Sequence, residues 1–145
     1  MTHNFLVEKA KEWLSISKRC NPVFTERWSA KSNEMPDAIG WSGEGSFLVE
    51  VKTSKADFLA DAKKPFRQNP DEGMGKFRYY LFPLELFEQI PETQLPDGWG
   101  IATIKENGYR PQQQRFMKSK EWEYDKKAEI YYLRSRIMQI QRFGR

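Results

Sequence analysis

Cysteine and histidine are almost absent from this sequence of 145 residues, which contains one of each. A single cysteine, Cys20, excludes an internal disulfide and therefore the disulfide framework of small secreted domains. The only histidine, His3, argues against histidine-based catalytic triads and histidine-ligated zinc. No apolar run approaches the roughly 20 residues that a membrane-spanning helix requires.

The first segment, MTHNFLVEKAKEWL, is unlike a secretory signal peptide because glutamate and lysine interrupt its apolar residues. With the single cysteine, this predicts a cytoplasmic protein without a membrane partner. The length suits one compact domain over residues 1–145. We expect its core to cover about residues 3–110, followed by a basic C-terminal helix over about residues 118–145.

The positive charge is concentrated at the C-terminal end. The net charge is +4, yet residues 1–117 contain 16 basic and 16 acidic side chains, while residues 118–145 contain 8 and 4. A basic segment on a neutral body could bind the phosphates of a polyanion. It could equally be an ordinary solvated helix face, and the charge alone leaves both interpretations open.

Hydrophobic spacing and turn residues predict an α/β fold. The expected order is helix, three strands, helix, strand, short helix, strand and helix, which implies a mixed central sheet flanked by helices. The predicted helices cover residues 3–18, a segment capped by Ser54, 84–90 and 119–142. The predicted strands cover residues 23–28, 35–41, 46–52, 77–83 and 99–104.

The strand SFLVEVK (46–52) carries two charged residues on one face. Because side chains alternate along a strand, Glu50 and Lys52 share a face, while Val49 and Val51 share the other. Charges in such an apolar strand are costly to bury unless they meet a partner. A turn at SGEG (42–45) could fold the segment that contains Asp37 back beside this strand, so that Asp37 meets Glu50.

Two converging carboxylates repel each other unless a cation lies between them, and carboxylate oxygens suit Mg²⁺. Such a cation polarises a phosphodiester and activates water, and a nearby lysine can stabilise the developing charge. Two other acidic-x-Lys triplets, at 61–63 and 125–127, lie in helical patterns. Only Glu50-Val51-Lys52 lies in a strand that follows Pro36-Asp37.

These segments resemble a known enzyme superfamily. PDAIGW followed by FLVEVKTSKADFLADAKKPF resembles the PD-(D/E)XK nucleases, and EVKTSKADFLADAKKP with YYLFP and LPDGWGIATI resembles the MmcB-like DNA-repair nucleases and related phage or bacterial proteins. The resemblance covers roughly residues 23–104. It implies a restriction-endonuclease-like αβββαβ core, a DNA substrate, and dependence on Mg²⁺, for which Mn²⁺ could substitute. It further implies a role in DNA repair, recombination or phage DNA metabolism, in a bacterial cell or a phage-infected host.

The same resemblance implies roles for particular residues. Asp37, Glu50 and the Val51 carbonyl would be metal ligands, and Lys52 would be the catalytic lysine. Glu26 could supply a further carboxylate or be a solvent-exposed strand residue, and both interpretations remain open. Asp57 and Asp61, one helical turn apart, are expected to cap the helix or pair with lysines rather than bind metal.

Basic residues after the catalytic strand are candidates for phosphate contact. The candidates for DNA binding are Ser54, Lys55, Lys63, Lys64, Arg67, Lys76 and Arg78. For Lys63 and Lys64, the alternative interpretation is a solvated helix face. The last two belong to a glycine-containing segment, NPDEGMGK (69–76) and the residues after it, which we expect to be a mobile surface loop.

The C-terminal helix mixes aromatic, apolar and basic residues. It could pack on the core or on a second subunit, giving a homodimer, or stack on single-stranded bases. Our first hypothesis is a Mg²⁺-dependent DNA endonuclease. The alternative is a catalytically silent DNA-binding or adaptor module with the same fold.

Overall fold

A computed structural model of the chain describes residues 1–25 and 35–144. The helices are α1 (His3–Ile16), α2 (Lys55–Asp61), α3 (Pro65–Gln68), α4 (Leu84–Glu88) and α5 (Lys126–Phe143), with 3₁₀ turns at Pro70–Glu72 and Glu92–Gln94. The strands are β1 (Val23–Thr25), β2 (Ala38–Ser42), β3 (Gly45–Val51), β4 (Phe77–Pro83), β5 (Gly100–Ile104) and β6 (Gln112–Gln113). The predicted order αβββαβ is confirmed.

One mixed sheet organises the described residues, with the strand order β1-β2-β3-β4-β5-β6. The first three strands form an antiparallel meander. β3, β4 and β5 are parallel, and β6 returns antiparallel to β5. A parallel pair needs a crossover, and α2 and α3 supply it between β3 and β4. The predicted mixed sheet flanked by helices is therefore confirmed.

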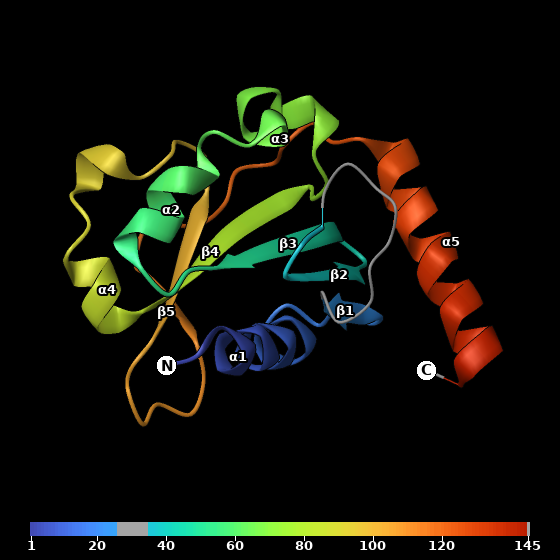
Figure 1. Cartoon of the computed structure of the whole chain (residues 1–145), viewed down its shortest axis with the longest axis horizontal. Helices are drawn as coiled ribbons and strands as arrows, with labels where there is room; N and C mark the ends of the chain where they lie inside the picture. Colours follow the sequence, from blue (N-terminus) through green and yellow to red (C-terminus); the bar gives the residue numbers. More distant parts are fainter. Residues whose placement is uncertain (26–34, 145) are drawn as a thin grey trace.

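The two faces of the sheet bury different sets of side chains. Val49 and Val51 pack in the same core cluster as Leu6 of α1. Leu48 belongs to the cluster on the other face, together with Phe58 of α2. Figure 1 shows α1 against one face and α2 with α3 against the other. Because Glu50 is an even-numbered residue of β3 like Leu48, its side chain lies on the α2 face.

The helix after β3 begins where its sequence predicts. Ser54 has extended backbone angles, and its hydroxyl accepts a hydrogen bond of 3.1 Å from the Asp57 backbone N–H. This N-cap satisfies one of the free donors in the first turn and turns the chain from strand to helix. It places the start of α2 immediately beyond the end of β3, close to Lys52.

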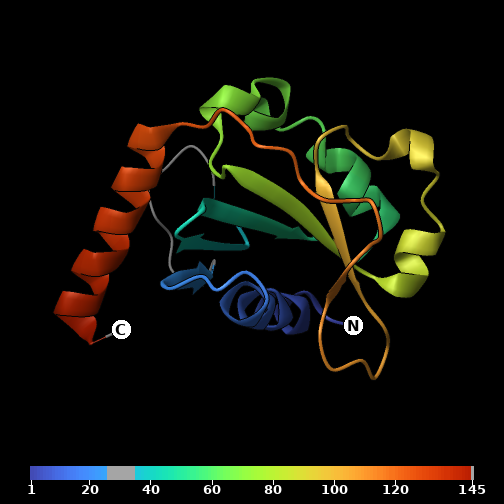
Figure 2. The ribbon, with the colours of Figure 1, turned by 180° about the vertical axis from the view of Figure 1, so that it is seen from behind.

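The C-terminal helix is shorter than predicted. α5 begins at Lys126, where Asp125 caps it by accepting from the Ala128 N–H at 3.0 Å. The residues before Asp125 cross back from β6 to α5 in an extended form (Figure 2). Trp122 is held there, since its backbone N–H donates to the Lys76 carbonyl and its indole N–H to the Gly98 carbonyl.

The prediction of a mobile loop over 69–76 is wrong for its second half. Gly73, Met74 and Gly75 are buried. Gly75 has a φ of 99°, and a Cβ there would lie 2.7 Å from Leu48 Cβ, so this close approach requires glycine. β6 and the 3₁₀ turns were not predicted. No helix among the described residues is long and apolar enough to cross a membrane.

Candidate functional site

Asp37 and Glu50 meet on the α2 face of the sheet, as the sequence predicts. Ala38 of β2 pairs with Val49 of β3, so the residue before Ala38 lies opposite Glu50. The Asp37 carboxylate accepts a hydrogen bond of 2.8 Å from the Val51 backbone N–H. Asp37 and Glu50 are only 7% and 2% exposed. Two acidic side chains are thus buried side by side where the hairpin opens.

This burial changes the protonation of Glu50. Removal from water, together with the negative charge of Asp37 and a side-chain hydrogen bond to it, raises the pKa of Glu50 to about 8, although Arg67 opposes the shift. A hydrogen bond between two carboxyl groups requires that one of them hold a proton. A divalent cation in that position would replace the proton and offset both negative charges.

The carboxylate oxygens of Asp37 and Glu50 therefore fit a magnesium site that leaves coordination positions free for water and substrate. Mg²⁺ commonly uses one or two protein carboxylates and completes its shell with water and phosphate oxygens. Within residues 1–25 and 35–144, no group of three or more His, Cys, Asp or Glu side chains is arranged to hold a metal. The protein would thus supply Asp37, Glu50 and the Val51 carbonyl. Glu26 lies outside the described residues.

Lys52 lies on the same face as Glu50, as predicted, and is only 3% exposed. Its Nζ donates to Asp61 Oδ1 at 3.0 Å and lies 4.0 Å from Asp57 Oδ1. An ammonium buried this deeply needs a carboxylate partner, and α2 supplies one. Asp61 therefore fixes the position of the proposed catalytic lysine.

Asp61 is the centre of a larger buried network (Tyr80, Arg67, Lys64, Lys52). The Tyr80 hydroxyl donates to it, Arg67 Nε donates to its Oδ2 at 2.7 Å, and Lys64 Nζ lies 2.9 Å from its Oδ1. Burial would raise the pKa of Asp61, but Arg67, Tyr80 and Lys52 hold it below its ordinary value. The prediction that Asp61 pairs with lysines is confirmed, and Tyr80 was missed.

Arg67 connects this network to the carboxylate pair. Its Nη2 donates to Glu50 Oε1 at 3.1 Å while its Nε binds Asp61, and its side chain is 5% exposed. The sequence prediction placed Arg67 on a DNA-contacting surface. That surface position is not observed, because the guanidinium is buried between two carboxylates. Arg67 orients Glu50 instead.

His3 also lies near the site, which the sequence did not indicate. Its Nε2 is 3.7 Å from Asp37 Oδ1. Thr2 caps α1 by accepting from the Phe5 N–H, which orders the first turn of the helix. His3 in this turn faces Oδ1 of Asp37, the residue just before β2.

Three of the predicted DNA-binding residues are exposed near the site. Ser54, Lys55 and Lys63 are exposed, and Lys64 is half-buried in its ion pair. Ser54 caps the start of α2, Lys55 is its first residue, and Lys63 and Lys64 follow its end. Together they form a mostly basic surface on which a phosphate backbone could be neutralised.

Arg78 and Lys76 do not belong to that surface. Arg78 is 1% exposed and donates to the backbone carbonyls of Gly75 and Pro70, so it does not lie on an exposed phosphate-binding surface. Lys76 precedes Phe77, whose partner in β3 is Phe47 near the start of that strand. Lys76 therefore lies toward the opposite end of β3 from Glu50.

Buried polar residues of the C-terminal helix α5 form hydrogen bonds with the rest of the protein. Glu129 accepts from the Gly75 N–H and the Ser46 hydroxyl, both at 2.7 Å. Arg136 donates to the Thr25 carbonyl at 3.2 Å, so it is not available to a polyanion. Exposed apolar residues remain on the outer side of α5. They are Ile130, Tyr131, Ile137, Met138, Ile140 and Phe143.

The comparisons with known proteins bear on the fold. No protein-family model and no curated protein matches the chain. A solved structure, the SPO1766 protein of unknown function from Silicibacter pomeroyi, is similar with a TM-score of 0.55 and 19% sequence identity. The match covers 84% of this chain and 80% of that chain. A similar fold thus occurs in a second protein.

Proposed function

We propose that this protein is a Mg²⁺-dependent nuclease that hydrolyses phosphodiester bonds in DNA. The observation that carries the proposal is the buried contact between Asp37 and Glu50, in which the pKa of Glu50 is raised to about 8. Two carboxylates that share a proton when no metal is present can bind a cation in place of that proton. A bound Mg²⁺ would supply Lewis acidity toward the phosphodiester and the attacking water.

The residues of the chain have separate roles in this proposal. Asp37 would hold the cation through the oxygen that does not accept from Val51. Glu50 would do so in the orientation fixed by Arg67, with the Val51 carbonyl as a third ligand. Lys52 carries no lone pair when protonated, so it would stabilise negative charge on the reacting phosphate rather than bind the metal.

One contact favours the alternative, a catalytically silent DNA-binding module. The bond from Arg67 to Glu50 Oε1 already offsets part of the charge that a cation would neutralise. Such an internal ion pair could stabilise the fold without any chemistry. The two functions differ in whether a metal accelerates bond cleavage, and this difference can be measured.

The test is a panel of end-labelled DNA and RNA substrates, with single-stranded, duplex and branched forms, incubated in Mg²⁺, Mn²⁺ or EDTA. We expect cleavage of at least one DNA form in either metal and none in EDTA. The Asp37→Asn variant, checked for folding by circular dichroism, is the control for contaminating nucleases and should be inactive. DNA binding without cleavage under every condition would favour the silent module.

A further inference from the structure

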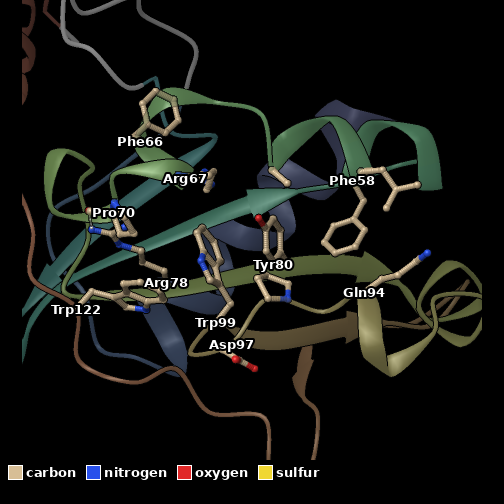
Figure 3. Close-up of a pocket in the computed structure, with 13 residues that line it drawn as sticks. Phe58, Phe66, Arg67, Pro70, Arg78, Tyr80, Gln94, Asp97, Trp99 and Trp122 are labelled. Carbon is tan, nitrogen blue, oxygen red and sulfur yellow. Dashed lines mark hydrogen bonds between the residues drawn. The ribbon is translucent and has the colours of Figure 1, made fainter.

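A pocket with a volume of about 260 Å³ opens beside the buried charge network on the α2 face. Figure 3 shows it between the segment that contains Phe66 and Arg67 and two aromatic residues, Tyr80 of β4 and Trp99, which precedes β5. Five of the thirteen residues that line it are aromatic, and Gln94 and Asp97 lie exposed at its rim. The proposed cleavage chemistry does not use this pocket.

The aromatic walls are held in fixed orientations. Trp99 stacks on Tyr80 with ring centroids 4.2 Å apart and an angle of 24° between the rings. The Arg67 guanidinium lies 4.6 Å from the centre of the Trp99 ring, and that of Arg78 lies 5.0 Å from the centre of Trp122. Aromatic side chains and guanidinium groups that line one pocket favour a flat, polarisable ring as ligand.

The pocket is connected to the carboxylate site through shared residues. Arg67 lines the pocket and donates to Glu50 Oε1 at 3.1 Å. Tyr80 also lines it, and its hydroxyl donates to Asp61, the partner of Lys52. A DNA strand with a phosphate at Glu50 would therefore bring a neighbouring base close to the pocket.

We propose that the pocket binds one unpaired nucleobase of the DNA strand that is cut at Asp37 and Glu50. The proposal rests on the proposed nuclease function. The volume is below the roughly 300–1,000 Å³ of pockets for drug-sized ligands, which suits one ring system rather than a base pair. The rim carries the amide of Gln94 and the carboxylate of Asp97, groups that can donate to and accept from the polar edge of a base.

Ala62 and Ala60 allow a matched test. Both are exposed alanines at the end of α2, but only Ala62 lines the pocket. Ala62→Trp fills the pocket and leaves its other wall residues in place, and Ala60→Trp adds the same bulk outside it. Neither residue belongs to the proposed catalytic or metal-binding group, so both variants should keep the fold and the metal site.

The measurement is fluorescence anisotropy in Ca²⁺ with two single-stranded oligonucleotides of roughly ten nucleotides, within the usual site size of single-strand binders. One carries bases and the other is abasic throughout. The parent and Ala60→Trp should bind the strand with bases roughly tenfold more tightly, the scale of one stacking contact. Ala62→Trp should bind both strands equally.

Cleavage in Mg²⁺ by the same three proteins separates the two proposals. Cleavage by the parent with equal binding of both strands, or equal effects of Ala62→Trp and Ala60→Trp, would overturn the base pocket and leave the nuclease intact. Base-dependent binding that is lost in Ala62→Trp, without any cleavage, would support the pocket and overturn the nuclease. Free deoxyadenosine monophosphate that binds as tightly as the strand would overturn the assignment to a DNA strand.

Discussion

Lys52 and Asp61 form a buried ion pair, with Nζ and Oδ1 3.0 Å apart, between the end of β3 and the end of α2. Lys52, which directly follows β3, is the proposed catalytic lysine. Among the described residues, its nearest carboxylate partner is Asp61 of α2, and Asp57 Oδ1 lies farther away at 4.0 Å. Removing one partner of a buried pair leaves the other charge without compensation. The Lys52–Asp61 pair therefore contributes both to the stability of the fold and to the position of the proposed catalytic lysine.

Asp61→Ala should destabilise the protein by about 3–5 kcal/mol, the usual cost of breaking a buried ion pair on one side. The matched control is Asp57→Ala, since Asp57 faces the same lysine from 4.0 Å but has a side chain that is 46% exposed. The control should cost less than about 1 kcal/mol. Urea unfolding measures both, and equal losses would show that the network around Asp61 does not stabilise the fold.

Metal binding should release a proton near neutral pH. Without a cation, the raised pKa of about 8 keeps Glu50 protonated at pH 7. Binding at pH 7 should therefore release about one proton, and affinity should weaken by about tenfold for each pH unit below 8. Calorimetry of Mn²⁺ binding in two buffers with different ionisation enthalpies measures the proton. Glu50→Gln should release none, and identical heats for the parent in both buffers would contradict the assignment.

The same shift has a consequence for the metal-free protein. Because the folded pKa of Glu50 lies above its ordinary value of 4.5, the folded state favours the protonated form. The contribution of Glu50 to the free energy of unfolding is fully present below pH 4.5 and is lost as the pH rises toward 8. Saturating Mg²⁺ should restore stability at pH 8, which thermal unfolding with and without the metal can detect.

Glu129 should hold α5 to the body. Glu129→Ala leaves the buried N–H of Gly75 and the hydroxyl of Ser46 without their acceptor. Each unsatisfied buried group costs about 1–3 kcal/mol, and the Gly75 amide should exchange faster with solvent. Lys127→Ala changes an exposed neighbour on the same helix and is the control. Equal exchange rates in the two variants would contradict this anchoring role.

Lys52→Ala should separate binding from catalysis. The variant should bind DNA in Ca²⁺ like the parent, because the lysine is buried and paired rather than exposed to the phosphate backbone. Its single-turnover rate in Mg²⁺ should fall by roughly a hundred- to a thousandfold, the effect of losing one contact to the transition state. Lys55→Ala changes an exposed lysine and should affect mainly affinity. An unaltered rate for Lys52→Ala would remove this lysine from the mechanism.

The meeting of Asp37 and Glu50 could be predicted because it depends on local rules. Alternation along β3 fixes the face of Glu50, and the turn at SGEG fixes which residue of the preceding segment lies opposite. The same rules placed β4 correctly from FRYYLFP. These features require only neighbouring segments of the chain.

The roles of Arg67, Arg78 and His3 could not be predicted because they depend on packing between distant segments. Arg67 follows Asp61 by six residues, and nothing in its sequence context shows that α3 turns it inward toward Glu50. Arg78 lies in a basic segment that resembles a surface loop, yet its guanidinium holds backbone carbonyls together. The predicted helix over 119–142 began too early, because the residues before α5 include Trp122, whose indole N–H donates to the distant Gly98 carbonyl.

The central claim is that Asp37 and Glu50 hold the cation that drives hydrolysis. The most direct test is the single-turnover rate of DNA cleavage in Mg²⁺ for Glu50→Gln, compared with the parent and with Asp57→Asn, which alters an exposed carboxylate near the site. We predict a rate at least about a hundredfold lower for Glu50→Gln and an unchanged rate for Asp57→Asn, because of these two residues Glu50 alone is a proposed metal ligand. A Glu50→Gln variant that cleaves DNA as fast as the parent would contradict the account.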